Sequence, residues 1–255
     1  MNILFTICGR AGSKGIKNKN LREFCGKPLV YYTVSAIDLY LKRHPEIAGT
    51  IVVNSDSKEL LQLVAQNGMR PVQQIARDER LAGDVVGKVA VVKNCLDIMG
   101  EQSEITFDMV VDLDITSPLR TVADLEAVIC KQMESNADVT TTVAPARRNP
   151  YFNQVKRVGR GVKKVIESEY TARQQAPKIY DMNASIYAFR PAFLKTTESL
   201  WEGYCEIVEM IDTGFLDLDH EKDFEFMEVI ADYLFQVNIG FSEIRDHIRD
   251  QIMFT

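Results

Sequence analysis

Short runs of apolar and β-branched residues recur along the chain and predict buried strands. They cover residues 3–8, 50–54, 109–113, 139–143 and 186–189. Most of the segments between them carry apolar residues at helical spacing. Because strands that alternate with helices build a mainly parallel sheet, the pattern predicts a three-layer α/β fold with helices on both faces of the sheet. We expect residues 1–255 to form a single domain.

The expected helices have recognisable start and stop signals. Pro28 stands where a first helical turn opens, and an apolar stripe at helical spacing follows it as far as Leu41. A second helix is predicted over residues 58–67, with Ser55 or Ser57 as its N-cap and Gly68 at its end. Further helices are predicted over residues 85–99, after Thr121, over residues 223–235 and over residues 241–254.

Residues 145–181 break the alternation of strands and helices. This segment is polar and basic, and its residues 152–166 carry a hairpin signal around Gly159-Arg160-Gly161. We expect an inserted region that projects from the sheet. Because its apolar residues need a surface to pack against, we expect a second subunit there, and hence a homodimer. A solvated excursion on a monomer is the alternative.

Charge and composition argue against several classes of protein. The net charge of −6 and the pI near 5.3 oppose an extended groove for nucleic acid. Every apolar run is shorter than a bilayer span, and Met1-Asn2 leads directly into a strand, so we expect a cytoplasmic protein without a membrane partner. The five cysteines include no C-x-x-C pair, which argues against a disulfide framework and a zinc site.

The first predicted strand leads into a loop rich in glycine and cations. From Gly9 the glycines follow the spacing G-x-x-G-x-x-G, and Arg10, Lys14 and Lys19 lie among them. Backbone N–H groups of such a loop can surround phosphate oxygens while the cations neutralise charge, so a triphosphate is the expected ligand. The spacing matches neither the dinucleotide fingerprint nor the Walker pattern. A solvated basic turn is the alternative interpretation.

Two pairs of carboxylates follow predicted strands. Asp112 and Asp114 alternate along one strand, and Asp217 and Asp219 repeat the spacing before a helix, so each pair is expected to share a face. Two neighbouring carboxylates repel unless a cation or a proton lies between them. Hard oxygen ligands suit Mg²⁺, and two such pairs with a cationic loop favour metal-assisted nucleotidyl transfer. For either pair alone, a solvated strand end is the alternative.

Several motifs together resemble the acylneuraminate cytidylyltransferases, which include CMP-sialic acid synthetases and relatives that act on other nonulosonic acids. The likeness covers nearly the whole chain, and its most specific motif is R-x-G-S-K-G-I-x-x-K-N at residues 10–20. Further matches are R-x-x-x-L-A-x-D at residues 77–84, T-S-P-L-R at 116–120, R-Q…P…N-x-x-x-Y at 173–187 and D-x-D at 217–219. The resemblance implies a fold like that of nucleotide-diphospho-sugar transferases and a reaction in which CTP and a keto sugar acid give a CMP-sugar and pyrophosphate, assisted by Mg²⁺.

The resemblance also implies roles for individual positions. The expected nucleotide-binding residues are Arg10, Gly12, Ser13, Lys14, Lys19, Asn20 and Arg77, and the expected catalytic residues are Arg10, Lys14, Lys19 and Asp217. The expected acceptor-binding residues are Asp114, Thr116, Arg173, Gln174 and Asn183, with Arg173 reaching the sugar of the partner subunit. Asp217 and Asp219 are the expected metal ligands, with Asp112 as a further candidate.

Departures from the family pattern concern the acceptor and the nucleoside. Asp114 stands where sialic acid enzymes usually have glutamine. It can join the metal site or accept hydrogen bonds from hydroxyl or amide N–H groups of the sugar, but an ionised carboxylate cannot donate a hydrogen bond. Residues 147–152 are closer to relatives that handle diacetamido sugars such as legionaminic acid. Ala184 stands where glycine is usual, and Lys88 where serine is frequent. Transfer to 3-deoxy-octulosonate or to a sugar phosphate, and a nucleotide-binding module without turnover, are the alternative functions.

Overall fold

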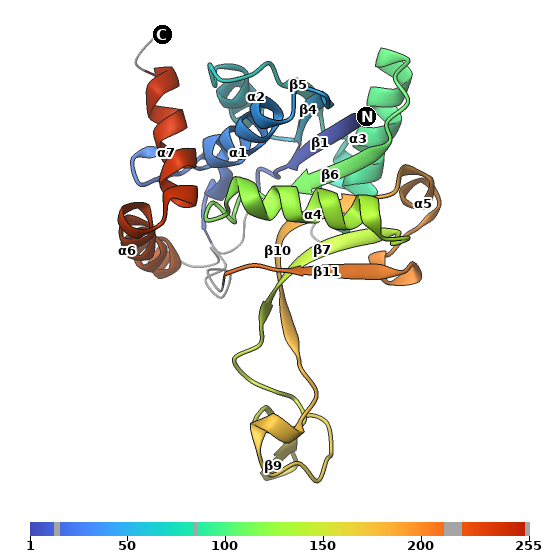
Figure 1. Ribbon diagram of the computed structural model, residues 1–255, viewed down its shortest axis with the longest axis vertical. Helices are drawn as coiled ribbons and strands as arrows, with labels where there is room; N and C mark the ends of the chain where they lie inside the picture. The colour runs from blue at the N-terminus through green and yellow to red at the C-terminus, as the bar shows by residue number, and fades with distance from the viewer. Residues whose placement is uncertain (13–15, 84–85, 212–220, 253–255) are drawn as a thin grey trace.

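A seven-stranded sheet with the order β11-β7-β10-β6-β1-β4-β5 forms the centre of the computed structural model, which describes residues 1–12, 16–83, 86–211 and 221–252 (Figure 1). Its strands are β1 (Asn2–Cys8), β4 (Ala48–Ser55), β5 (Gln73–Ala76), β6 (Met109–Leu113), β7 (Val139–Pro145), β10 (Tyr180–Phe189) and β11 (Cys205–Glu209). Among these described strands, β10 alone runs antiparallel to its neighbours, β6 and β7. The expected mainly parallel sheet is therefore confirmed.

Helices cover both faces of the sheet, which confirms the expected three layers. One apolar core joins the sheet to α1 (Leu29–Arg43), α2 (Lys58–Ala65), α4 (Val122–Glu134), α6 (Glu221–Val237) and α7 (Ile239–Ile252). The opposite core joins it to α3 (Lys88–Ser103) and α5 (Pro191–Thr196). Alternation along β1 explains the division, because Ile3, Phe5 and Ile7 enter the first core and Leu4 enters the second.

The helix starts follow local hydrogen bonds. The Ser57 hydroxyl accepts a bond from the backbone N–H of Leu60, so Ser57 rather than Ser55 caps α2. Thr121 and Asp124 form a reciprocal capping box at the start of α4. The start predicted near residue 85 was three residues early, because α3 begins at Lys88 behind Gly87. Among the helices that the structure describes, none has the length and apolarity to span a bilayer.

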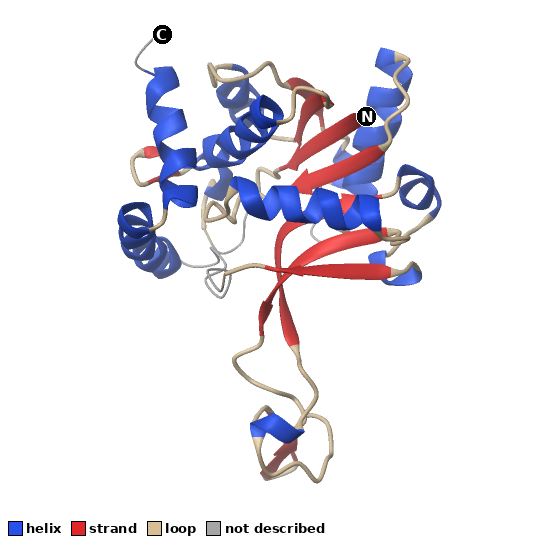
Figure 2. Cartoon of the chain, viewed as in Figure 1, coloured by secondary structure: helices blue, strands red, loops and turns tan. Residues whose placement is uncertain are grey.

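The inserted region, called the arm here (residues 145–181), projects away from the sheet (Figures 1 and 2). Its hairpin consists of β8 (Val155–Val158) and β9 (Gly161–Lys164), and the turn between them uses Gly159 at φ +58°, which confirms the expected hairpin. The hairpin exposes apolar side chains, with Val155 and Val162 each 59% exposed. The packing of the arm against a second subunit stays a prediction.

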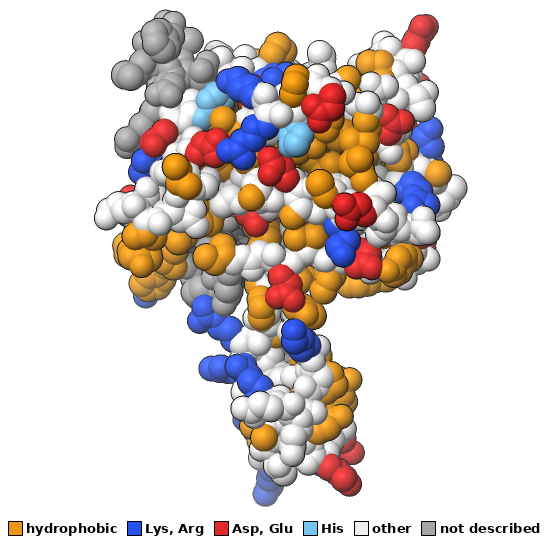
Figure 3. Space-filling view, viewed as in Figure 1, with side chains coloured by type: hydrophobic (Ala, Val, Ile, Leu, Met, Phe, Trp, Pro, Cys, Tyr) orange, Lys and Arg blue, Asp and Glu red, His pale blue; other side chains and the backbone are white. Residues whose placement is uncertain are grey.

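The remaining elements are short. A two-stranded ribbon of β2 (Glu23–Phe24) and β3 (Lys27–Pro28) precedes α1, and the 3₁₀ turns are η1 (Lys19–Leu21), η2 (Glu79–Leu81), η3 (Arg173–Gln175) and η4 (Leu200–Glu202). Apolar side chains also gather on the surface over α6 (Figure 3), where Phe226, Val229 and Tyr233 are exposed. At the C-terminal end, His247 of α7 lies 2.7 Å from the buried carboxylate of Asp38 on α1.

Candidate active site

One edge of the sheet collects the loops that carry the candidate residues. The pairing directions place the carboxyl ends of β1, β4, β5, β6, β7 and β11 at this edge, called the carboxyl edge here. Because β10 runs the opposite way, its first residues start at the same edge. The carboxyl edge of a parallel sheet is where ligands bind in open α/β folds. The carboxyl edge therefore brings together four parts of the chain: the basic loop, the acidic end of β6, both ends of the arm and the start of the segment after β11.

The basic loop (residues 9–20) is fixed to the sheet at its start. The Gly9 N–H donates to the carbonyl oxygen of Asn54. A Cβ at Gly9 would lie 2.7 Å from Leu60 Cδ2 and 2.8 Å from Ile115 Cδ1, so a larger residue would push these side chains aside and glycine allows the close approach of the loop to α2. Further along, the Asn20 amide donates to the Arg10 carbonyl oxygen at 3.1 Å. These contacts bring Arg10 and Asn20 together as predicted.

A cavity of about 160 Å³ lies beside the basic loop and is lined by Arg10, Ala11, Asn18, Asn20, Leu21, Ser57, Glu59 and Leu60. Lys19 opens the 3₁₀ turn between two of these lining residues. A Cβ at Gly12 would meet no atom within 4 Å, so Gly12 faces open space. Ser13 and Lys14 lie outside the described residues, and their predicted contacts with the nucleotide stay predictions.

Arg77 joins the basic loop through Asn54, a residue that the sequence patterns did not single out. The Arg77 guanidinium donates to the Asn54 side-chain oxygen at 2.7 Å and to the Asn54 carbonyl oxygen at 2.9 Å. Gly9 donates to that same carbonyl oxygen, so the backbone carbonyl of one buried residue, Asn54, contacts both predicted nucleotide-binding segments. Its only sequence signal was a polar residue that ends a buried strand.

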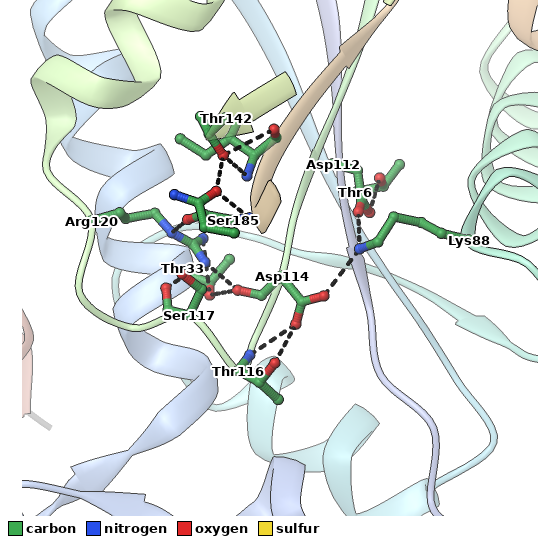
Figure 4. Close-up of polar contacts among 12 residues, drawn as sticks. Thr6, Thr33, Lys88, Asp112, Asp114, Thr116, Ser117, Arg120, Thr142 and Ser185 are labelled. Atoms are coloured by element: carbon green, nitrogen blue, oxygen red, sulfur yellow. Dashed lines mark hydrogen bonds and ion pairs between the residues drawn. The ribbon is translucent and has the colours of Figure 1, made fainter. Parts of the chain in front are cut away.

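The Asp112 and Asp114 carboxylates share one face of β6, as the alternation predicts, and the Lys88 ammonium lies between them (Figure 4). Lys88 Nζ donates to Asp112 Oδ2 at 2.7 Å and to Asp114 Oδ2 at 3.1 Å. Asp112 Oδ1 also accepts a bond from the Thr6 hydroxyl. Both oxygens of Asp112 are therefore occupied within the protein, and these contacts do not favour its candidate role as a metal ligand, which stays a prediction.

The pKa values of Asp114 and Lys88 are shifted in the directions that keep both side chains charged. Burial alone would raise the pKa of Asp114, but Lys88 and the hydrogen bonds from Thr116 lower it to about 2. Burial alone would lower the pKa of Lys88, yet Asp112 and Asp114 raise it well above its ordinary value. Thr116, predicted to bind the acceptor, thus contacts Asp114 directly, through its backbone N–H and its hydroxyl at 2.9 Å each.

Asn183 lies at the same edge on β10, and its side chain is almost fully buried. Its amide oxygen accepts a bond from the Thr142 hydroxyl at 2.6 Å, and its amide nitrogen donates to Met210 Sδ at 3.4 Å. These contacts hold Asn183 between β7 and the chain that leaves β11. The predicted contact of Asn183 with the acceptor is untested.

Arg173 and Gln174 lie on the arm, where they line a second cavity of about 360 Å³ with Pro145, Ala146, Asn149, Ala176, Pro177, Lys178, Ile179, Tyr180 and Glu209. The Arg173 guanidinium donates to the Arg147 carbonyl oxygen. This cavity and the cavity beside the basic loop share no residue. The expectation that Arg173 serves the site of a partner subunit stays a prediction.

Asp217 and Asp219 lie outside the described residues, but both flanks of their segment are fixed at the carboxyl edge. On one side Met210 contacts Asn183, as described above. On the other side Glu221, which opens α6, accepts hydrogen bonds from Arg22 at 2.9 and 3.0 Å, just after the basic loop. The donors that the sequence predicts are carboxylate oxygens, which fit Mg²⁺. Among the residues that the structure describes, no group of three His, Cys, Asp or Glu side chains could hold a metal ion.

Arg120, which closes the T-S-P-L-R motif, is almost fully buried. Its guanidinium donates to the carbonyl oxygens of Asp114 and Ser117 and to the Ser185 hydroxyl (Figure 4). It thereby joins the loop after β6 to β10, and so holds the backbone on which Asp114 and Thr116 stand. This role of Arg120 could not be predicted from the sequence, because an arginine in a polar motif is typical of a solvated loop.

Ala184 follows Asn183 with φ +52°, in the left-handed region. A side chain there costs about 1–2 kcal/mol, so Ala184→Gly is expected to raise the free energy of unfolding by about 0.5–1 kcal/mol after the larger chain entropy of glycine is subtracted. Equilibrium unfolding in urea measures this change in the free energy of unfolding. The control is Ala188→Gly on the same strand. Ala188 is not among the residues with a positive φ, so this substitution should lower the free energy of unfolding. A loss of stability in Ala184→Gly equal to that of the control would contradict the assignment of strain.

Comparison with known proteins bears on the chemistry of this edge. A family model described as "Cytidylyltransferase" matches residues 4–246. The chain belongs to the cytidylyltransferase family. It is thus a CTP-dependent nucleotidyltransferase by family, and the resemblance seen in its motifs is confirmed.

Similar curated proteins come from Campylobacter. The chain is 35% identical over 229 residues to "CMP-N,N'-diacetyllegionaminic acid synthase" of Campylobacter jejuni, covering 89% of this chain and 94% of the relative. It has the same identity and coverage to "Post-translational flagellin modification protein B" of Campylobacter coli. "Pseudaminic acid cytidylyltransferase" of Campylobacter jejuni is 26% identical over 236 residues, which cover 90% of this chain and 96% of the relative.

Solved structures agree on the fold. The structure of CMP:2-keto-3-deoxy-manno-octonic acid synthetase complexed with CTP matches with a TM-score of 0.61 and 16% identity, over 90% of this chain and 98% of the other. The 4-diphosphocytidyl-2C-methyl-D-erythritol synthase of Anaerococcus prevotii matches with a TM-score of 0.60 and 10% identity, over 90% of this chain and 98% of the other. The sheet and its helices are therefore those of known nucleotidyltransferases.

Proposed function

We propose that this cytidylyltransferase couples CTP to the anomeric hydroxyl of a nonulosonic acid and releases pyrophosphate. The observation that carries the proposal is the meeting of two sets of residues at the carboxyl edge. Arg10, Asn20 and Arg77 are brought together through Gly9 and Asn54, while Asp114 and Asn183 lie at the ends of the neighbouring β6 and β10. The first set suits a nucleoside triphosphate, and the second suits a polyhydroxylated acceptor beside it.

The reaction needs positioning and charge stabilisation more than covalent help from the protein. In this proposal Arg10, Lys14 and Lys19 bind the triphosphate and stabilise the charge that grows on the departing pyrophosphate. Arg77 and Asn20 hold the nucleoside side of CTP. The acceptor hydroxyl then lies in line with the bond that breaks, held by Asp114, Thr116 and Asn183. Asp217 and Asp219 would hold Mg²⁺, which when bound would supply further neutralisation of the phosphates.

For the acceptor we favour a diacetamido nonulosonic acid of the legionaminic type. Asp114 offers an acceptor of hydrogen bonds where an amide stands in sialic acid enzymes, and the N–H of an acetamido group is a matching donor. The name of the 35% identical relative from Campylobacter jejuni points to the same class of sugar. We further propose a homodimer, supported by the exposed valines of the arm hairpin, in which Arg173 of each arm serves the acceptor of the other subunit.

The decisive experiment measures pyrophosphate release from CTP and Mg²⁺ with a panel of keto sugar acids. The panel contains N,N'-diacetyllegionaminic acid, its pseudaminic isomer, N-acetylneuraminic acid and 3-deoxy-octulosonate. We expect the highest kcat/KM with the legionaminic acid. A higher kcat/KM with 3-deoxy-octulosonate, or no release with any nonulosonic acid, would overturn the proposal.

A further inference from the structure

The Lys88 ammonium has the position that a metal ion takes between two carboxylates. Its two hydrogen bonds, 2.7 Å to Asp112 and 3.1 Å to Asp114, join side chains that would otherwise repel at the edge of the sheet. Mg²⁺ would need carboxylate oxygens at about 2.0–2.1 Å, and the positive charge of Lys88 opposes a second cation there. The pair on β6 is thus neutralised by the protein itself.

Within the described part of the chain, the hydrogen bonds to Asp114 leave one acceptor position of its carboxylate open. An ionised carboxylate offers about four lone-pair sites. Oδ1 accepts two bonds from Thr116, and Oδ2 accepts one from Lys88. About a quarter of the Asp114 side chain is exposed, whereas Asp112 is fully buried. Of the two carboxylates, only Asp114 can therefore accept a bond from a ligand, through Oδ2, the oxygen that Lys88 holds.

The side chain of Lys88 is itself fixed on several sides. It leaves the first residue of α3, and its ammonium lies 5.1 Å from the centre of the Tyr187 ring on β10, in a cation–π contact. The ammonium thus links α3 to the neighbouring strands β6 and β10 on one face of the sheet. A shift of Lys88 would change where Oδ2 of Asp114 points, while Arg77 and the basic loop have their own contacts with Asn54.

We propose that Lys88 is a positioning residue for acceptor binding: it replaces a metal ion between Asp112 and Asp114 and orients the one free acceptor site of Asp114 toward the sugar. The proposal rests on the proposed placement of the acceptor at this edge. It assigns the metal dependence of the reaction to residues other than Asp112 and Asp114. The competing explanation is that Lys88 only neutralises the buried Asp112.

Two variants separate these explanations by steady-state kinetics. Lys88→Met leaves two uncompensated carboxylates, so we expect this single variant to lose stability. Lys88→Met combined with Asp112→Asn removes both charges of the buried pair and should keep the fold. In the double variant we expect a thermal midpoint close to that of the native protein, an acceptor KM raised about tenfold, and a CTP KM within twofold of the native value. A native acceptor KM in the double variant would overturn the proposal, as would a CTP KM raised as much as the acceptor KM.

A second readout needs neither CTP nor acceptor, so it stands even when no sugar of the panel is turned over. Mn²⁺ bound to the protein is counted by electron paramagnetic resonance in the native protein, in Lys88→Met and in the double variant. We expect Lys88→Met to bind one Mn²⁺ more than the native protein, and the double variant to lose this extra ion. Equal counts in the native protein and in Lys88→Met would contradict the replacement of a metal ion by the ammonium.

Discussion

Lys19→Ala is expected to lower kcat for pyrophosphate release by about 100- to 1000-fold, the loss that follows removal of one preorganised group that stabilises transition-state charge. Lys19 opens the 3₁₀ turn of the basic loop, beside the cavity that Arg10 and Asn20 line. The backbone of Lys19 is held by this turn, in which the Arg22 N–H donates to the Lys19 carbonyl oxygen, so little backbone reorganisation is needed when charge develops on the leaving pyrophosphate. Initial rates at saturating CTP and acceptor measure the effect.

The matched control for Lys19→Ala is Lys17→Ala, since Lys17 is an exposed cation of the same loop to which no role is assigned. Lys17→Ala should keep kcat within about threefold of the native value, although it changes the net charge of the loop by the same amount as Lys19→Ala. Similar losses in both variants would mean that the loop acts through its total charge. Unchanged pyrophosphate release in Lys19→Ala would remove Lys19 from the catalytic residues.

Arg120→Met is expected to lower the free energy of unfolding by about 3–5 kcal/mol, because it leaves buried acceptors without their donor. Arg120 is 1% exposed, and its guanidinium donates to the carbonyl oxygens of Asp114 and Ser117 and to the Ser185 hydroxyl. Burial lowers the pKa of Arg120 to about 10 despite the nearby Asp114, Asp112 and Asp124, so it remains charged at neutral pH. For a chain of this size the thermal midpoint should fall by roughly 10 °C.

The control for Arg120→Met is Arg80→Met, in which the lost side chain is 88% exposed and paired only at the surface with Asp78. Differential scanning calorimetry should show no resolvable change for it. If Arg120→Met had the same thermal midpoint as Arg80→Met, water would have replaced the lost donor and other contacts would hold the loop after β6.

Regular elements could be predicted because their signals are local. The strand over Met109–Leu113 was predicted to the residue, since all five of its side chains are buried and form one continuous apolar run around Asp112. The strands β5 and β11 were missed because they have only four and five residues and few buried side chains, so no apolar run marks them. Alternation along β6 was enough to place Asp112 and Asp114 on one face.

The partners of the site residues could not be predicted, because they come from distant parts of the chain. Lys88 lies 24 residues before Asp112, at a helix start, where a lone lysine is typical of a solvated surface. Arg120 reaches Ser185 across 65 residues, and its burial depends on the irregular start of β10. Asn54 is one polar side chain at the end of a strand. The roles of Lys88, Arg120 and Asn54 depend on tertiary contacts with distant residues, and no sequence motif or spacing predicts those contacts.

The reversed direction of β10 has a consequence for how such an enzyme can diversify. Both ends of the arm emerge at the carboxyl edge, where we propose that the acceptor binds, so the arm can gain, lose or exchange residues while the strands of the sheet keep their order. Chain added between closely spaced ends costs little in loop closure. The nucleotide loop follows β1, separated from β10 by β6. In the proposed function, substitutions in the arm can therefore change the preference for the sugar without changing the basic loop that is proposed to bind the triphosphate.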